Sequence, residues 1–168
     1  CPGCLGGAVA ASEAEVAVSN SILEENAAAD GGALHLTTST LLLNASEVLR
    51  SNATRHGGGV AAHGGSLVML GGRLEANAAN DTHGEGGALL LNATTSARFE
   101  GSSLEANSAA NGAGVAALAC LVVEFSSCTL RQNRAVQGAA VYASASTVQA
   151  SGSVLRANVA SGGGGGFC

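Results

Sequence analysis

The side chains most able to do chemistry lie close together in one part of the chain. His56, Asp81, His83 and Glu85 fall within 30 consecutive residues, in a sequence with four histidines and two aspartates. Imidazole and carboxylate groups are common ligands of zinc and other divalent metals. The four residues are therefore a candidate metal or ligand site. The alternative, which we favour, is a solvated loop somewhat longer than its counterparts, so we predict no bound metal or cofactor.

Hydrolysis or elimination of acidic polysaccharides would need a different set of residues. Glycoside hydrolysis uses two carboxyl groups that face one bond, and lyases add calcium ligands and a base. Asp30 and Asp81 are the only aspartates, and there is no lysine. We therefore predict that the chain is not an enzyme. The alternative is a carbohydrate-active protein, a polysaccharide lyase or hydrolase, whose site lies outside this segment or in the 80–85 loop.

An internal repeat identifies the elements that would hold these residues. Six segments read Leu-x-x-Asn: Leu23–Asn26, Leu49–Asn52, Leu74–Asn77, Leu104–Asn107, Leu130–Asn133 and Leu155–Asn158. Each is followed by a short small or polar stretch, and the first five then lead into a triplet of glycine and alanine such as Gly31–Ala33. Successive asparagines are 26, 25, 30, 26 and 25 residues apart. Six full units run over residues 6–162, in one domain that spans residues 1–168.

Within a unit, apolar residues recur with period two, which is typical of strands. An aliphatic residue always follows the triplet, at Val9, Leu34, Val60, Leu89, Val115 and Val141. The next, outward position carries no acid, at Ala10, His35, Ala61, Leu90, Ala116 and Tyr142. Three short strands in about 25–29 residues describe one coil of an all-β, single-stranded, right-handed parallel β-helix. Since no coil buries its apolar face alone, about six coils stack at ~4.8 Å into a solenoid ~29 Å long.

One asparagine in every coil is predicted to lie at the same corner. These residues are Asn26, Asn52, Asn77, Asn107, Asn133 and Asn158. Side-chain amides stacked in this way can donate to one another, and a buried polar group is tolerated only when it is satisfied. We therefore predict a structural asparagine ladder with no catalytic residue in it. The glycines at the next corner permit a positive φ.

The two repeated motifs together resemble those of a known family. Gly-Gly-Ala followed by Leu or Val, paired with Leu-x-x-Asn, resembles the repeats of polymorphic outer-membrane (Pmp-type) proteins, which carry Gly-Gly-Ala-Ile and Phe-x-x-Asn. The resemblance covers residues 6–166, with leucine in place of phenylalanine at all six sites. The chain is also similar to the broader class of right-handed, pectin-lyase-like β-helix proteins, including Ala/Gly-rich surface proteins of algae and other protists. This resemblance implies a surface-exposed adhesive or structural rod.

A column of charges follows the repeated leucine. It reads Glu24, Arg50, Glu75, Glu105, Arg131 and Arg156. Opposite charges on neighbouring strands form ion pairs worth about 0.2–1 kcal/mol and help to set the register. Arg98 and Glu124 are expected to pair in the same way on another face. Because the signs alternate, we do not expect the column to bind anions.

The five cysteines are Cys1, Cys4, Cys120, Cys128 and Cys168. Cys120 and Cys128 flank an extended segment, so a direct bridge between them would need a bend. A lone Cys-x-x-Cys without a second pair is weak support for zinc or redox chemistry. The other three cysteines are the disulfide candidates, paired near the termini or with sequence beyond this segment.

Four Asn-x-Ser/Thr sequons provide candidate glycosylation sites. Asn44, Asn80 and Asn92 are the plausible acceptors in a eukaryotic secretory route, with Asn80 and Asn92 on predicted turns. Asn52 is expected to be inaccessible because it belongs to the predicted ladder. We therefore predict a glycoprotein, although chance sequons are expected in a chain rich in Asn, Ser and Thr.

Composition and charge narrow the function class. The net charge of −5 without a basic cluster disfavours nucleic acid, and no apolar run is long enough for a membrane span. The chain begins and ends within a coil without capping units, which indicates a segment of a longer protein. If the chain were complete, exposed edges would favour head-to-tail filaments. We predict a non-enzymatic extracellular or cell-surface rod or fibre subunit, with other protein chains, extracellular matrix or glycans as partners.

Overall fold

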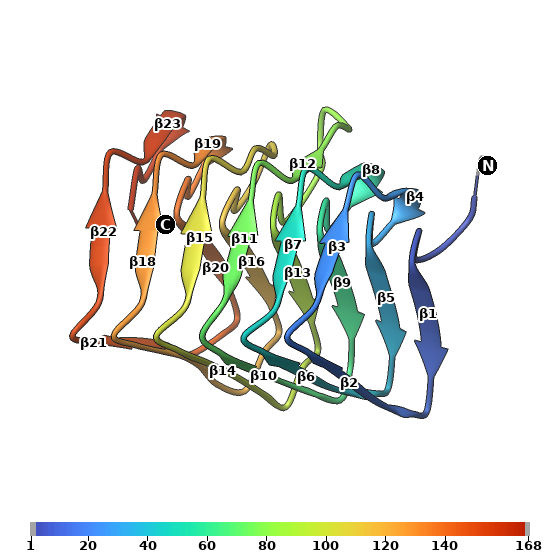
Figure 1. Ribbon diagram of the computed structural model, residues 1–168. Coiled ribbons are helices and arrows are strands. Elements are labelled where there is room, and N and C mark those ends of the chain that lie inside the picture. Colours follow the sequence, from blue (N-terminus) through green and yellow to red (C-terminus); the bar gives the residue numbers. More distant parts are fainter. Residues whose placement is uncertain (1–2, 167–168) are drawn as a thin grey trace.

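The computed structural model describes residues 3–166 and confirms the predicted β-helix. The chain winds into a right-handed parallel β-solenoid of about six coils, which lie one behind another in Figure 1. No helix occurs among the described residues, so none there is long and apolar enough to cross a membrane.

Three six-stranded parallel sheets form the main sides of the solenoid, and each coil contributes one strand to each sheet. The first sheet contains β1 (Val9–Ser12), β5 (Leu34–Thr37), β9 (Val60–His63), β13 (Leu89–Asn92), β16 (Val115–Leu118) and β20 (Val141–Ser144). The second contains β2 (Glu15–Ser19), β6 (Thr40–Asn44), β10 (Ser66–Leu70), β14 (Ser96–Glu100), β17 (Val123–Ser126) and β21 (Val148–Ser151). The third contains β3 (Ile22–Glu24), β7 (Glu47–Leu49), β11 (Arg73–Glu75), β15 (Ser103–Glu105), β18 (Thr129–Arg131) and β22 (Val154–Arg156).

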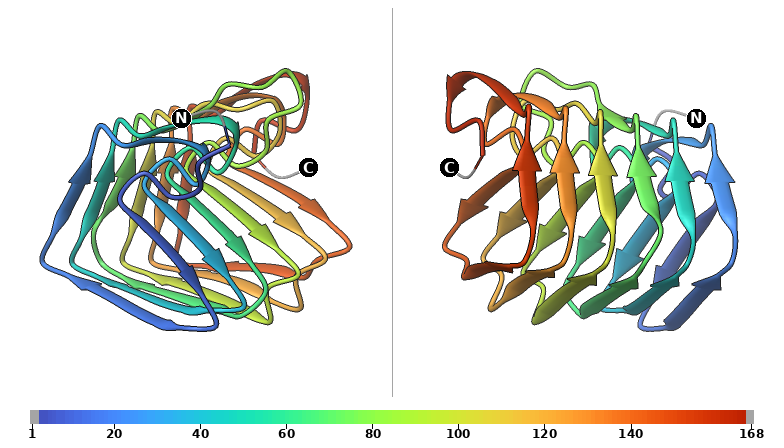
Figure 2. Two further views of the ribbon diagram at one scale, coloured as in Figure 1. Left: turned by 90° about the vertical axis from the view of Figure 1, so that its right-hand side faces the viewer. Right: turned by 60° about the vertical axis from the view of Figure 1, so that its left-hand side comes forward.

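A shorter fourth side closes each coil and lies at the top of Figure 1. Its strands are β4 (Ala27–Asp30), β8 (Asn52–His56) and β12 (Ala78–Ala79) in one small sheet, and β19 (Arg134–Gln137) and β23 (Val159–Gly163) in another. The loop between β12 and β13 rises above this side in green, and both views of Figure 2 show the strands of successive coils side by side.

Alternation places one apolar column from each strand position in the interior. The predicted aliphatic column of the first sheet faces inward, and Leu34, Val60 and Leu89 are fully buried in it. In the second sheet, the rings of Phe99 and Phe125 stack in adjacent strands with centroids 4.9 Å apart. The solenoid therefore has one continuous core that runs through all its coils.

The corner before the first sheet is the one that requires glycine. The residues that turn it with a positive φ are Gly6, Gly31, Gly57, Gly86, Gly112, Gly138 and Gly164. A Cβ on Gly31 would lie 2.1 Å from the carbonyl oxygen of Leu34, so no larger residue fits. Other corners have similar φ values at residues such as Glu25 and Ala106, which shows that crowding as well as φ selects glycine here.

This glycine corner also folds back over the outer surface of the first sheet. A Cβ added to Gly57 would lie 2.8 Å from the Cβ of Ala61, an outward-facing residue of β9. Ala61, Leu90 and Ala116 are consequently buried although they point away from the core. The outward column of the first sheet, which would be the natural floor of a substrate cleft, is therefore covered along these coils.

The second coil departs from the register expected from the repeat. Val48, not Leu49, pairs with Leu23 and Leu74 and fills the inward column. The ladder position is likewise taken by Ser51, while Asn52 pairs with Ala27 and Ala78 and is exposed. The prediction that Asn52 is an inaccessible ladder residue is wrong. The strand pairing keeps the interval from the second to the third sheet constant, and this constraint overrides the Leu-x-x-Asn match.

Candidate functional site

A group of ionisable side chains that includes two nearly buried members lies in the N-terminal half of the solenoid, between the fourth side and the outer surface of the first sheet. It contains Asp30 from β4, His35 from β5, Arg55 and His56 from β8, and His63 from β9. Asp30 and His35 are each only 8% exposed. We call these five residues the histidine cluster.

Two sets of direct contacts occur within the histidine cluster. Arg55 Nη2 forms an ion pair with Asp30 Oδ2, and the backbone N–H of His56 donates to Asp30 Oδ1 at 3.2 Å. The rings of His35 and His63 lie with centroids 5.4 Å apart and planes inclined by 39°. The carboxylate of Asp30 therefore has a cation and a backbone donor, both from the next coil.

A local irregularity of the fourth side brings Arg55 to Asp30. Ala28 pairs with Ala53, but Asp30 pairs with His56, so β8 has one more residue than β4 over this interval. An extra residue of this kind is a β-bulge, which commonly redirects a side chain. The interval from the ladder corner to the glycine corner is correspondingly longer in the second coil, and the additional residue places a cation beside a nearly buried carboxylate.

Burial favours the neutral form of the two neighbouring imidazoles, because it lowers the pKa of each. Burial lowers the pKa of His35 below its usual 6.5, and the neighbouring His63 lowers it further. Burial also lowers the pKa of His63, against the opposing effect of the Asp30 carboxylate. The tilted His35–His63 pair and the Asp30–Arg55 ion pair form a mainly structural arrangement, in which Asp30 and His35 are buried and the Arg55 side chain is 52% exposed.

The sequence showed parts of this cluster without showing the whole. Asp30 and His56 are in register, as their positions before the glycine corners indicate, and His35 faces outward on its strand as expected. What was missed is that the fourth side covers this part of the first sheet. No signal for the bulge was present in the sequence, because Asn52 is five residues before Gly57, the same spacing as from Asn26 to Gly31.

The proposed ligands of the 80–85 loop do not converge. Asp81 Oδ1 accepts a hydrogen bond from the backbone N–H of His83 at 2.9 Å, and this bond lowers the pKa of Asp81. His56 Nδ1 instead accepts from the backbone N–H of Glu85 at 3.2 Å. Within residues 3–166, no three His, Cys, Asp or Glu side chains are arranged to hold a metal ion. The loop is held together by its own turn contacts.

A ladder of asparagine amides runs through the last four coils. Asn77 Nδ2 donates to Asn107 Oδ1 at 3.1 Å, Asn107 Nδ2 to Asn133 Oδ1 at 3.0 Å, and Asn133 Nδ2 to Asn158 Oδ1 at 2.9 Å. Each amide also donates to a carbonyl of the preceding coil, as Asn107 does to Leu74 at 3.0 Å. Both amide hydrogens are thus used, and Asn77, Asn107 and Asn133 are fully buried.

The ladder weakens toward the N-terminus. Ser51 replaces asparagine in the second coil, and its backbone N–H donates to Asn77 Oδ1 at 2.9 Å. Asn26 therefore has no amide in the next coil to receive its hydrogen bond, although its backbone carbonyl accepts from the N–H of Asn52 at 2.8 Å. Asn26 shares the ladder corner but not the amide chain.

The same register change alters the charged column on the outer surface of the third sheet. Leu49 pairs with Glu24 and Glu75 where Arg50 was expected, so the column reads Glu24, Leu49, Glu75, Glu105, Arg131 and Arg156. Arg50 instead turns the corner with φ 47°, and it forms the predicted ion pair with Glu24 and a second one with Glu25. The signs are segregated along the column, and the predicted alternation is wrong.

Elsewhere the charges pair locally. Arg131 Nη2 lies 2.6 Å from Glu105 Oε2 on the neighbouring strand, as predicted. Arg98 and Glu124 are in register, but Arg98 forms its ion pair with Glu100 of its own strand at 3.2 Å. Arg73 contacts Glu47 at 3.2 Å and Glu75 at 2.7 Å. Most of these groups are half-exposed, so they contribute little to stability individually.

The cysteines fall into two groups. Cys4 is disulfide-bonded, and the other candidates, Cys1 and Cys168, lie outside the described residues. Cys120 and Cys128 are free and buried at two corners. Their backbone N–H groups donate to Ser146 and Ser153 Oγ, at 2.8 and 3.0 Å, and their thiols take places that serines occupy in other coils. These two cysteines are structural.

The four sequons differ in how they are presented. Asn44 and Asn92 end β6 and β13, and the hydroxyl residues of their sequons, Ser46 and Thr94, are buried. Asn80 lies on the exposed loop with an exposed Thr82. Asn52, expected to be hidden, is exposed together with Thr54 on β8. Two sequons, at Asn52 and Asn80, therefore offer both of their polar residues to solvent.

Comparison of the chain with known protein families, with curated sequences and with solved structures finds no match. The assignment of a parallel β-solenoid therefore rests on the strand pairing in the structure alone.

Proposed function

We propose that this chain is a non-enzymatic structural rod of an extracellular or cell-surface protein, serving as a spacer, an adhesive element or part of a surface fibre. The observation that carries the proposal is the continuity of its register. Each of the three main sheets has one strand from every coil, and the inward columns continue from coil to coil. A solenoid built in this way is elongated and stiff along one axis.

The use of the polar residues supports the same proposal. The buried asparagines donate to one another and to the backbone, and in the histidine cluster the nearly buried Asp30 is compensated by Arg55. Such groups contribute to order within the rod, since their donors and acceptors are already paired. We therefore expect partners to bind to the outer surface of the solenoid.

Two further observations support a location outside the cytosol. Cys4 is disulfide-bonded, and disulfides persist mainly in oxidising compartments. The Gly-Gly-Ala and Leu-x-x-Asn motifs also resemble the repeats of Pmp-type surface proteins. We accordingly propose other surface proteins, extracellular matrix or glycans as partners, with glycans attached at exposed sequons.

The experiment combines a test for catalysis with a test for location. The purified chain is incubated with acidic and neutral polysaccharides, and new reducing ends and unsaturated products are measured. We expect none. In parallel, antibodies against the chain are applied to intact, non-permeabilised source cells, and we expect surface labelling. Turnover lost in an Asp81→Ala, His83→Ala, Glu85→Ala triple variant would instead establish the enzymatic alternative, and labelling only after permeabilisation would refute the location.

A further inference from the structure

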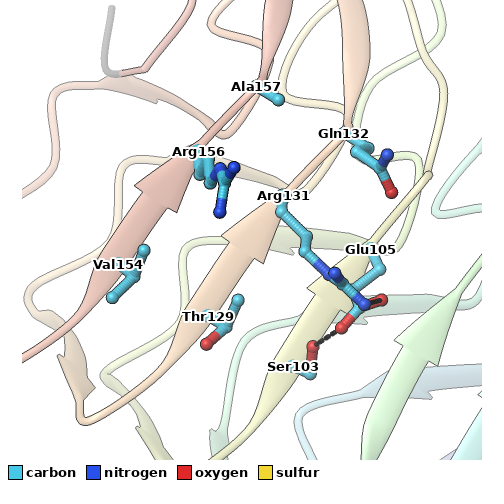
Figure 3. Close-up of a pocket in the computed structure, with 8 residues that line it drawn as sticks. All are labelled: Ser103, Glu105, Thr129, Arg131, Gln132, Val154, Arg156 and Ala157. Atoms are coloured by element: carbon cyan, nitrogen blue, oxygen red, sulfur yellow. Dashed lines mark hydrogen bonds and ion pairs between the residues drawn. The ribbon is translucent and has the colours of Figure 1, made fainter.

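A hollow lies on the outer surface of the third sheet, over β15, β18 and β22 (Figure 3). Its volume is about 560 Å³, which is within the usual range for small-ligand sites. The residues that matter for its chemistry are Ser103, Glu105, Thr129, Arg131, Val154 and Arg156. All of them point outward from the solenoid, so the hollow is separate from the core and from the histidine cluster.

The single carboxylate in this hollow is already compensated. Glu105 Oε2 lies 2.6 Å from Arg131 Nη2, and Ser103 Oγ donates to Glu105 Oε1. The side chain of Glu105 is only 12% exposed, and its pKa is lowered mainly by the hydrogen bond from Arg131. Glu105 is therefore a fixed anion that orients Arg131 and has little capacity left for a second cation.

Arg156 is the uncompensated group. No ion pair joins it to any residue within 3–166, and Figure 3 shows its guanidinium lying over the hollow between β22 and β18. Arg131 and Arg156 are direct partners in the register of β18 and β22, with Thr129 and Val154 as the other outward residues of those strands. The lining thus contains two guanidinium groups and one carboxylate.

Two like charges directly opposite each other on adjacent strands are destabilising. Neither β18 nor β22 has an outward acid that would offset this repulsion. A bound anion would offset it, because guanidinium groups recognise carboxylate and sulfate through paired hydrogen bonds. This end of the column is positive because arginine occupies the outward position in both of the last two coils.

We propose that the hollow binds an oligosaccharide that carries carboxylate or sulfate groups. Arg156 holds the anionic group with Arg131 beside it, and the Thr129 hydroxyl and the exposed Gln132 amide are placed to bond sugar hydroxyls. The backbone of β15 and β18 is paired on both sides, and the one open edge at this end of the sheet, that of β22, lies in the plane of the sheet and not over its outer surface, where the hollow is. The polar groups of the hollow are spread over three neighbouring strands, which suits an extended sugar chain better than a single side-chain anchor.

This inference names a ligand for one face of the proposed rod and relies on that proposal only for access to extracellular sugars. Its test is calorimetric titration of the full chain with four probes of equal length: an oligogalacturonate, a sulfated oligoglucan, a neutral oligoglucan and an oligoglutamate. We expect one or both acidic sugars to bind, with an affinity that falls as salt is added. Which of the two binds identifies carboxylate or sulfate as the recognised group.

Variants locate the site. Arg156→Gln should weaken binding by about tenfold or more, since a charge-assisted hydrogen bond is lost, and Arg156→Lys should retain part of it. Arg98→Gln is the matched control, because it removes an exposed arginine from the second sheet, and it should leave binding unchanged. Circular dichroism checks that each variant is folded.

Three results would overturn the inference. These are no binding of either acidic sugar, equal binding of the neutral sugar or of oligoglutamate, and equal losses in Arg156→Gln and Arg98→Gln. None of these outcomes bears on the stiffness, location or lack of turnover of the rod, so the proposed function and this site can fail separately.

Discussion

Asn107 and Asn133 are joined twice, because Asn133 Oδ1 accepts hydrogen bonds from both the side-chain amide and the backbone N–H of Asn107, each at 3.0 Å. One oxygen therefore satisfies two donors of the preceding coil. Asn107 repeats the arrangement toward Asn77, with distances of 2.9 and 3.1 Å. The ladder thus connects the asparagine side chains of one coil to the backbone at the corner of the preceding coil.

Asn107→Ala is expected to destabilise the rod strongly. It leaves two donors of Asn77 and the carbonyl of Leu74 without partners, and each such buried group costs about 1–3 kcal/mol. The free energy of unfolding, measured by urea titration, should fall by at least about 3 kcal/mol. Asn52→Ala is the matched control, since Asn52 is exposed, and it should cost less than about 1 kcal/mol. Equal losses would refute the observed register.

Gly112→Ala should be far more harmful than Gly101→Ala, although the two residues have similar φ values of 60° and 57°. A Cβ on Gly112 would lie 2.3 Å from the carbonyl oxygen of Val115, whereas a Cβ on Gly101 meets nothing within 4 Å. Gly101→Ala should cost about 1–2 kcal/mol for the left-handed conformation alone. Thermal melts of the two variants compare these costs directly, and similar melting temperatures would show that φ, not crowding, selects glycine.

Arg55→Gln should destabilise the chain more than the Arg98→Gln substitution of an exposed pair. It leaves the Asp30 carboxylate, whose side chain is 11% exposed, without its cation. Removing the cation from a mostly buried carboxylate in this way costs about 1–3 kcal/mol, toward the lower end because the Arg55 side chain is 52% exposed, while the exposed Arg98–Glu100 pair contributes about 0–1 kcal/mol. Urea titration at neutral pH measures both. Equal stability of the two variants would show that the Asp30–Arg55 ion pair contributes no more to stability than an exposed pair.

Acidification should weaken the rod through His35 and His63. Because burial lowers the pKa of both imidazoles, the unfolded chain takes up protons as the pH falls through 6.5 while the folded chain does not. The stability that depends on the neutral rings is therefore present above pH 6.5 and decreases below it. A His35→Gln, His63→Gln double variant should lose part of this pH dependence.

His83→Gln is the control for this pH dependence, since the His83 side chain is 92% exposed. Its stability should follow the unmodified chain across the same pH range. Unfolding titrations on either side of pH 6.5 make the comparison, and histidine chemical shifts report the individual pKa values. A folded-state pKa at or above 6.5 for both His35 and His63 would contradict the assigned cause.

The repeat by itself determined the fold of this chain. Period-two alternation, the recurrent glycine corners and a nearly constant spacing leave the parallel β-helix as the arrangement that buries every aliphatic column. The pairing of Glu105 with Arg131 also followed from that spacing. These features are local or repeat from coil to coil, so they can be predicted from the order and spacing of residues in the sequence.

Only the tertiary structure decided which residues of the second coil face inward and which side chains meet between sides. Val48 and Ser51 occupy the places expected for Leu49 and Asn52, because strand pairing requires a constant interval between sheets. The histidine cluster and the segregated charges of the third sheet both depend on that interval. A one-residue offset reverses every side chain of a strand, and only hydrogen bonding between coils selects the offset that is adopted.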